Sequence, residues 1–136
     1  MTKLAIAAAL ASLLASMGAA AAQSFPSRPV TIIAPFPAGG PLDTIARIIS
    51  EPMRSMLGQP VVIETGAGAG GNLGTGRVAR AAADGYTLGI GQWSTHVVNP
   101  VTYNVPYDVL NDFEPIALLT ITPQLIIARK DFPARM

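Results

Sequence analysis

Cysteine is absent from this chain of 136 residues, and charged residues make up only 12% of it. Without cysteine the chain can form no disulfide, has no thiol nucleophile and offers no thiol for a lipid anchor. The formal net charge is +1, and the charged residues are scattered rather than gathered into runs. A chain of this kind has no electrostatic footprint for nucleic acid, so we expect no nucleic-acid partner.

Catalytic motifs are scarce as well. His96 is the only histidine, no serine lies in a G-x-S-x-G turn, and the acidic residues are too dispersed to predict a metal site. Ser94 is close to His96 in sequence, but neighbouring side chains rarely face each other as a nucleophile and its base must. His96 is therefore expected to be a polar loop residue or a donor to a ligand. We expect a binding protein without a cofactor, not an enzyme.

The first residues have the pattern of a secretory signal peptide. Lys3 precedes an uncharged stretch rich in alanine and leucine, which ends in the small residues GAAAAQS. Ala20 and Ala22 predict cleavage after Ala22, which assigns residues 1–22 to the signal peptide. An uncleaved anchor is the alternative, but the leucine-rich part is shorter than the roughly 20 apolar residues of a membrane span. We expect export by the general route into a periplasm.

The stretch TIIAPFPAGGPLDTIARII, residues 31–49, changes its pattern half-way. Its first part is an apolar run bounded by proline and glycine, which predicts a buried strand, whereas Ile45, Ile48 and Ile49 have the spacing of one helix face. The junction leaves the first backbone N–H groups of the helix unpaired at the positive end of its dipole, which suits a carboxylate or phosphate. The alternative is that Gly39 and Gly40 only form the turn.

The rest of the chain continues this alternation of strands and helices. We expect the helix to run from Pro41 to Leu57, with a kink or an early end at Pro52, which removes one helical hydrogen bond. A short second helix is predicted from Asn72 or Gly74, and further strands in PVVIET, DGYTLGIGQ and QLIIAR. This order predicts an α/β fold with a parallel sheet, in which ligands bind beyond the carboxyl ends of the strands.

The glycine run GAGAGG, residues 66–71, contains a literal G-x-G-x-x-G after a predicted strand. A dinucleotide-binding fingerprint, however, belongs to the first strand of its unit and needs an acidic residue at the end of the next strand. The next acid along the chain, Asp84, precedes a strand instead, and the run lacks the lysine of a phosphate-binding P-loop. The run is therefore weak evidence for a nucleotide cofactor.

Three loops are expected at the carboxyl edge of the sheet, at residues 37–43, 66–74 and 92–96. Their backbone and side-chain polar groups suit the binding of a ligand but form no evident catalytic arrangement. These groups belong to Gly39, Gly40, Asn72, Gln92, Ser94, Thr95 and His96. Asp43 has two possible roles, because a carboxylate near a helix N-terminus stabilises the helix even without a ligand. Phe36 and Trp93 could line a pocket, although an isolated aromatic residue more often fills the core.

Four sequence blocks occur in a characteristic order: PFPAGGPLD, GAGGNLG, DGYTL and PYDVLNDFEPI. Together they resemble the substrate-binding receptors of tripartite tricarboxylate transporters, the Bug family, over nearly all of residues 23–136. The resemblance implies a lobe of a type II periplasmic-binding-protein-like fold with a mainly parallel sheet. In such receptors two α/β lobes close around a small organic carboxylate and deliver it to the permease subunits in the membrane.

The resemblance also implies which residues hold the solute. In the family, the loop after the first strand grips one end of the ligand, largely through backbone amides and with the help of ordered waters. The ligand-binding residues that the resemblance implies are Phe36, Pro37, Ala38, Gly39, Gly40, Asp43, Asn72, Gly74, Ser94, Thr95 and His96. Asp43 would orient the loop or bind water.

The family pattern divides the chain into a signal peptide (1–22), an incomplete first lobe (23–128) and the start of a crossover to an absent second lobe (129–136). Family members are more than twice as long, so we expect a truncated receptor whose missing lobe sets most of the specificity. Two rival hypotheses remain open. They are a secreted α/β enzyme acting on a small carboxylated substrate, and a non-functional fragment.

Overall fold

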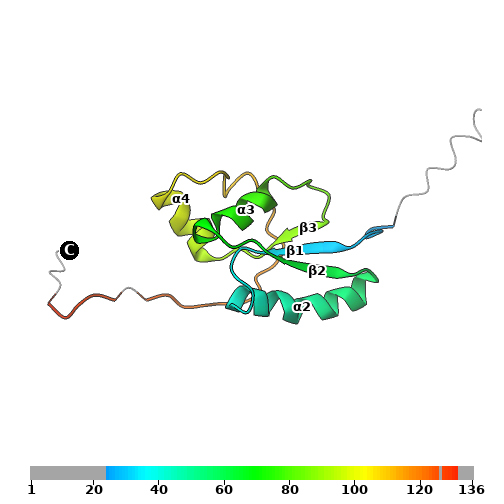
Figure 1. Cartoon of the computed structure of the whole chain (residues 1–136), viewed down its shortest axis with the longest axis horizontal. Helices are drawn as coiled ribbons and strands as arrows, with labels where there is room; N and C mark the ends of the chain where they lie inside the picture. Colours follow the sequence, from blue (N-terminus) through cyan, green and yellow to red (C-terminus); the bar gives the residue numbers. More distant parts are fainter. Residues whose placement is uncertain (1–23, 126, 132–136) are drawn as a thin grey trace, which may run out of the picture.

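The computed structural model describes residues 24–125 and 127–131, so the predicted signal peptide and its cleavage site after Ala22 lie outside the described residues (Figure 1). Strands, α-helices and two short helical turns of 3₁₀ (η2) and π (η3) type follow one another along the chain. They are β1 (Val30–Ala34), α2 (Pro41–Leu57), β2 (Val61–Thr65), η2 (Ala69–Gly71), α3 (Asn72–Ala79), β3 (Thr87–Gly89), η3 (Ser94–Val98) and α4 (Asn99–Thr102).

The three strands form one parallel sheet in the order β2-β1-β3, which confirms the predicted α/β fold. Val30 of β1 lies opposite Val61 of β2, and Thr31 lies opposite Thr87 of β3. Figure 1 shows α2 on one face of the sheet and α3 on the other. The central strand is therefore covered on both faces, which explains why its sequence is a continuous apolar run rather than an alternating one.

Helix α2 supplies one side of the main core. Leu42 and Ala46 are buried in a cluster with Ile32 and Ala34 of β1, and Ile90 completes it. The side chains of Leu42 and Ala46 lie on one face of α2, as the spacing of an amphipathic helix requires.

The predicted isoleucine face is only partly the buried one. Ile45 and Ile49 pack against the core, whereas the side chain of Ile48 is 67% exposed. The buried face continues with Met53 instead.

Of the two effects expected of Pro52, a kink or an early helix end, the early end is wrong, since α2 continues to Leu57. Gly58 then ends the helix as predicted, with a φ of 65° and an N–H that donates to the Arg54 carbonyl at 3.1 Å. Ile49 and Met53, on either side of the proline, both pack on the core. This packing compensates for the single hydrogen bond that Pro52 removes, because tertiary contacts contribute most of the stability of helices in proteins.

The predicted strand in QLIIAR is also wrong for the residues that the structure describes. Residues 124–125 and 127–129 have no regular secondary structure, and the side chains of Leu125 and Ile127 are each 87% exposed. An apolar run favours a strand only where a neighbouring strand and a buried face are available to it. Within the described ranges, no helix is both long and apolar enough to cross a membrane.

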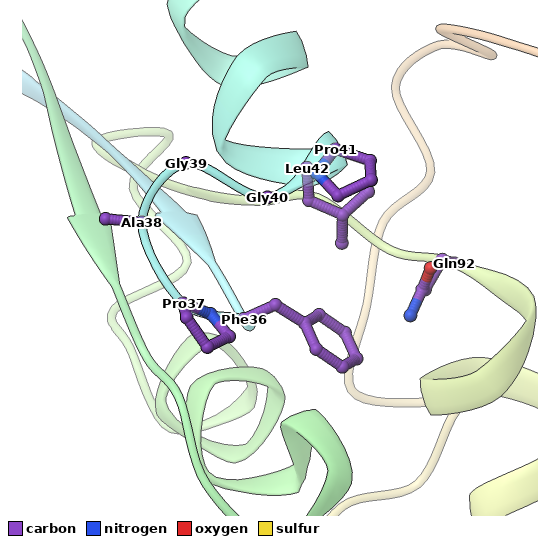
Figure 2. Close-up of a pocket in the computed structure, with 8 residues that line it drawn as sticks. All are labelled: Phe36, Pro37, Ala38, Gly39, Gly40, Pro41, Leu42 and Gln92. Carbon is purple, nitrogen blue, oxygen red and sulfur yellow. The ribbon is translucent and has the colours of Figure 1, made fainter.

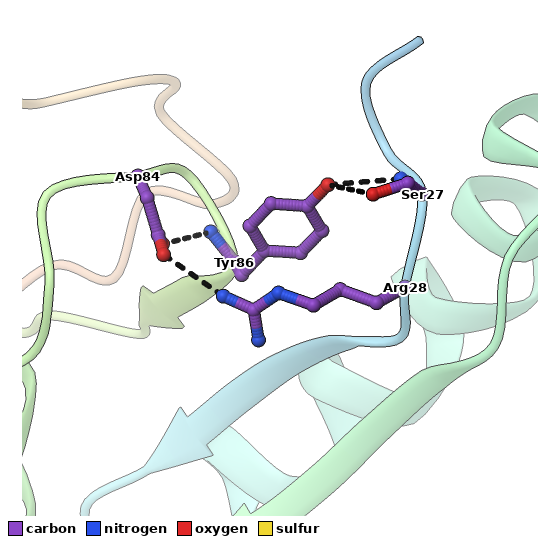
Figure 3. Close-up of polar contacts among 4 residues, drawn as sticks. All are labelled: Ser27, Arg28, Asp84 and Tyr86. Atoms are coloured by element: carbon purple, nitrogen blue, oxygen red, sulfur yellow. Dashed lines mark hydrogen bonds and ion pairs between the residues drawn. The ribbon is translucent and has the colours of Figure 1, made fainter. Parts of the chain in front are cut away.

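Polar and aromatic side chains close the amino end of the sheet (Figure 3). Arg28 donates to Asp84 at 2.8 Å, and its guanidinium carbon lies 3.9 Å from the centre of the Tyr86 ring. The Ser27 N–H donates to the Tyr86 hydroxyl at 2.8 Å. We call Ser27, Arg28, Asp84 and Tyr86 the amino-end cluster. It joins the segment before β1 to the turn before β3.

Candidate functional site

A hollow of about 440 Å³ lies at the carboxyl end of β1 (Figure 2). The loop that leads into α2 forms most of its wall, and Gln92 closes it from the loop after β3. The lining residues are Phe36, Pro37, Ala38, Gly39, Gly40, Pro41, Leu42 and Gln92. This volume is within the usual range for small-molecule sites. None of the lining side chains is charged.

Asp43 holds the loop in shape. One of its oxygens, Oδ2, accepts the Gly39 N–H at 2.8 Å and the Arg47 Nε–H at 3.0 Å. Gly39 has a φ of 80°, in the left-handed region that glycine adopts readily and other residues do not. The hydrogen bond from Arg47 and that from the Gly39 amide keep the pKa of the Asp43 carboxyl below its usual range. Arg47 also offsets the negative charge next to the hollow.

The start of α2 presents backbone donors to the same place. Gly40, the N-cap residue, has no side chain that could cap the helix. The first helical hydrogen bond is donated by the Thr44 N–H to the Gly40 carbonyl at 3.0 Å. The N–H groups of Leu42 and Asp43 precede it, so helix geometry gives them no helical acceptor. The Gly39 N–H, in contrast, donates to Asp43 and the Gly40 N–H to the Pro37 carbonyl at 3.3 Å, so of the expected backbone donors those of the first helical turn are the ones without a helical acceptor.

The second oxygen of Asp43 is unusual. The residue is only 3% exposed, and its Oδ1 is buried without a hydrogen-bond donor among the described residues. A buried carboxylate oxygen is stabilised by a donor, and leaving it unmatched is costly. Asp43 thus supports the loop through one oxygen and offers the other as an acceptor.

The residues implied in the second loop are packed into the protein. Asn72 is 9% exposed and accepts a hydrogen bond from Asn99 at 2.7 Å. A Cβ added to Gly74 would lie 2.8 Å from both Pro35 Cα and the Gly66 carbonyl oxygen. Glycine is required there because the first turn of α3 passes directly against the end of β1. Neither Asn72 nor Gly74 lines the hollow.

The third loop contributes Gln92 to the hollow, whereas the three residues implied there, Ser94, Thr95 and His96, do not line it. Gln92 Nε2 donates to Ser94 Oγ at 2.7 Å. Thr95 is completely buried. The His96 ring lies 5.1 Å from the Phe113 ring, centre to centre, and its Nδ1 is 2.8 Å from Thr95 Oγ1. Burial lowers the pKa of His96, which favours the neutral ring.

The structure therefore brings together the implied residues 36–40 in the wall of the hollow, with Asp43 behind them. Pro41 and Leu42 also line the hollow and follow the glycine pair directly, but neither was among the ligand-binding residues implied by the family resemblance. Gln92 was expected only among the polar groups of the loops. Within the part of the chain that the structure describes, no group of three or more His, Cys, Asp or Glu residues could hold a metal ion.

Comparison with known proteins identifies the family. Residues 45–136 match the family model described as tripartite tricarboxylate transporter family receptor. The chain belongs to this family. The family is one of receptors, in agreement with the prediction of a binding protein rather than an enzyme.

Curated and solved relatives of these receptors agree with this assignment. Protein BugT of Bordetella pertussis is 39% identical over 108 residues, which are 78% of this chain and 33% of BugT. The structure of MatC from Rhodopseudomonas palustris with bound malate is 48% identical with a TM-score of 0.67, over 70% of this chain and 33% of MatC.

A second structure from R. palustris, solved with adipate, is 38% identical with a TM-score of 0.61, over 63% of this chain and 29% of that chain. A structure described as a periplasmic transporter is 45% identical with a TM-score of 0.61. The chain thus spans about a third of the length of these relatives. Its sheet and helices correspond to part of a periplasmic-binding-protein structure.

Proposed function

We propose that this chain is part of a periplasmic receptor that binds a small organic carboxylate and delivers it to the permease of a tripartite tricarboxylate transporter. The observation that supports this most directly is the hollow at the start of α2, whose wall has no charged side chain and includes the first helical turn, where helix geometry leaves backbone N–H groups without a helical acceptor. Relatives solved with malate and with adipate bind solutes of this chemical class.

The charges and the helix dipole around the loop favour the binding of one acid group of the solute. The Leu42 and Asp43 amides lie at the positive end of a helix of 17 residues, where an anion is stabilised by the helix dipole. The Asp43 carboxylate alone would repel such an anion. Its ion pair with Arg47, with Nε and Oδ2 3.0 Å apart, reduces that repulsion.

Each implied site residue takes a distinct role in this proposal. Residues 36–40, with Leu42 and Gln92, contact the solute. Asp43 shapes the loop through Oδ2, and its buried Oδ1 accepts a hydrogen bond from a water held behind the wall. Ser94 acts by holding Gln92. The remaining implied residues support the loops from behind, and they are Asn72, Gly74, Thr95 and His96.

The lobe assignment is also part of the proposal. Residues 23–128 form most of the first lobe of a two-lobed receptor, and residues 129–136 begin the crossover to the second. The second lobe then provides the other half of the solute contacts. The signal peptide at residues 1–22 would direct export, and cleavage after Ala22 would give a mature protein starting at Gln23.

Calorimetric titration of the complete receptor with malate and adipate tests the function. We expect saturable heat with one of these or with a related dicarboxylate, and recovery of the solute unchanged. The corresponding diamides have similar shape without the charge and are expected to bind at least about tenfold more weakly. Turnover of the solute, or equal affinity for the diamides, would contradict the proposal.

A further inference from the structure

Buried polar side chains gather behind the hollow, where the second and third loops meet the segment before Tyr107. The side chains of Asn72, Asn99 and Tyr107 are all less than a tenth exposed. Asn99 Nδ2 donates to the Gly70 carbonyl at 3.0 Å and to Asn72 Oδ1 at 2.7 Å. The Tyr107 hydroxyl donates to Asn72 Oδ1 at 2.9 Å and to the Thr95 carbonyl at 2.7 Å. We call these five residues the loop-joining network.

The donor and acceptor roles in the loop-joining network follow from its backbone carbonyls, which can only accept hydrogen bonds. The Gly70 carbonyl can only accept, so the amide nitrogen of Asn99 faces it. The same nitrogen meets Asn72, which therefore presents its oxygen. Since Asn72 Oδ1 and the Thr95 carbonyl both accept, the Tyr107 hydroxyl must act as a donor, with one proton for two acceptors. Asn72 Oδ1 also accepts from Asn99, but within the network only the Tyr107 hydroxyl donates to the Thr95 carbonyl.

The network is in direct contact with the wall of the hollow. Gly71 lies between Gly70 and Asn72, and its φ of 92° together with its surroundings excludes a side chain. A Cβ at Gly71 would lie 2.7 Å from Thr95 Cγ2 and 2.9 Å from Phe36 Cζ. The Phe36 ring thus rests on the backbone of the second loop, next to Thr95. A shift of either loop changes the surface on which Phe36 packs.

We infer that Tyr107 is a positioning residue of the solute site: its hydroxyl holds the second and third loops at a fixed separation, and through Gly71 and Thr95 it fixes the position of Phe36. Tyr107 is 8% exposed and does not line the hollow, so it acts without touching the solute. The effect on solute affinity rests on the proposed function. The effect on the third loop does not.

The Tyr107→Phe variant of the complete receptor tests both effects. Trp93, which precedes η3 and is 48% exposed, provides a readout for the third loop. We expect acrylamide to quench the Trp93 fluorescence more strongly in the variant, because the third loop loses its tie to the second. We also expect the affinity for malate or adipate to fall about tenfold, as for the loss of one buried hydrogen bond.

Two matched tyrosine variants separate positioning from general stability. Tyr86→Phe removes a hydroxyl from the amino-end cluster (Figure 3) and is expected to lower the melting temperature while Trp93 quenching and solute affinity stay unchanged. Tyr103→Phe changes a tyrosine that is 63% exposed and is expected to alter none of the three. Asn99→Ala breaks the loop-joining network at Gly70 and is expected to repeat both effects of Tyr107→Phe. It provides a second test if that variant does not fold.

The outcomes are distinct. A lower melting temperature with unchanged Trp93 quenching and unchanged affinity would show that Tyr107 is only structural, and the inference would be wrong. If the wild-type receptor binds no carboxylate, the proposed function fails, and the quenching comparison of Tyr107→Phe with Tyr86→Phe still decides whether Tyr107 positions the third loop.

Discussion

At the amino end of the sheet, Ser27, Arg28, Asp84 and Tyr86 bind one another, whereas at the carboxyl end residues 36–42 surround a hollow of about 440 Å³. Both ends are formed by segments that flank β1 and β3. At the amino end, charged and aromatic side chains form an ion pair and a cation–π contact with one another. At the carboxyl end, the donors are backbone amides at the start of a helix, and the only polar side chain in the wall is Gln92.

This difference indicates which end is available to a ligand. A loop whose charged groups are already paired gains little by binding an anion, because the existing contacts would have to break. Helix N-terminal amides cannot be paired within their own helix and keep their capacity for an external acceptor. Four variants break or sharpen the comparison, beginning with the one whose expected effect is largest.

Gly40→Leu is expected to weaken solute binding about a hundredfold or more, since the new side chain fills the hollow that the solute needs. The φ of Gly40 is −78°, so the backbone accepts a side chain, although its Cβ would lie 3.2 Å from the Pro37 carbonyl oxygen. Titration of the complete receptor measures the effect. Gly58→Ala, at the other end of α2, should cost about 1 kcal/mol of stability and leave affinity intact. Unchanged affinity in Gly40→Leu would place the solute elsewhere.

Asp43→Asn is expected to lower stability at neutral pH, because it removes the ion pair with Arg47 next to the loop. The pKa of Asp43 is lowered in the folded protein, so this stabilisation is complete above the ordinary Asp pKa and is lost as the pH falls through the folded value. The difference in unfolding free energy between wild type and variant, measured in urea, should therefore be constant above about pH 4 and shrink progressively as the pH is lowered further.

Arg47→Met provides the control for this pH dependence. It removes the main cause of the lowered pKa, so the part of the stability that depends on the Asp43 charge and is lost on acidification should be smaller than in the wild type. An identical acid transition in both proteins would contradict the role given to this ion pair.

Pro52→Ala is expected to raise the free energy of unfolding by about 1–2 kcal/mol, because it restores a donor for the Ile48 carbonyl while giving up part of the unfolded-state restriction that proline provides. Urea unfolding measures this change. Ser55→Ala, at another exposed position of α2, should change stability by less than about 0.5 kcal/mol. Solute affinity should be unaffected by either substitution, and destabilisation by Pro52→Ala would show that the proline is required in the helix.

Arg28→Ala is expected to have the smallest effect, a loss of about 0.5–1 kcal/mol of stability, since its ion pair with Asp84 and its contact with the Tyr86 ring are both exposed. High salt should reduce the loss. The affinity for the solute should remain that of the wild type. A clear change in affinity would mean that the two ends of the sheet are coupled.

Local patterns in the sequence predicted most of the elements. The glycine loop, the start of α2 at Pro41 and its end at Gly58 were all expected and are present. The errors occurred where a local rule competes with packing. Pro52 lies inside α2 because Ile49 and Met53 anchor the helix on both sides, and QLIIAR lacks a strand in its described residues because its side chains have no buried face.

The prediction of the site also divides into a part that local sequence determines and a part that packing decides. The sequence by itself determined the helix N-terminus and its preceding glycines, because capping and turn preferences act within a few residues. Only the tertiary structure decided that Asn72 and Thr95 are buried behind the hollow and that Gln92 lines it. Those positions depend on contacts such as the bond from Tyr107 to Asn72, which joins residues 35 positions apart. Spacing along the chain carries no signal for such contacts.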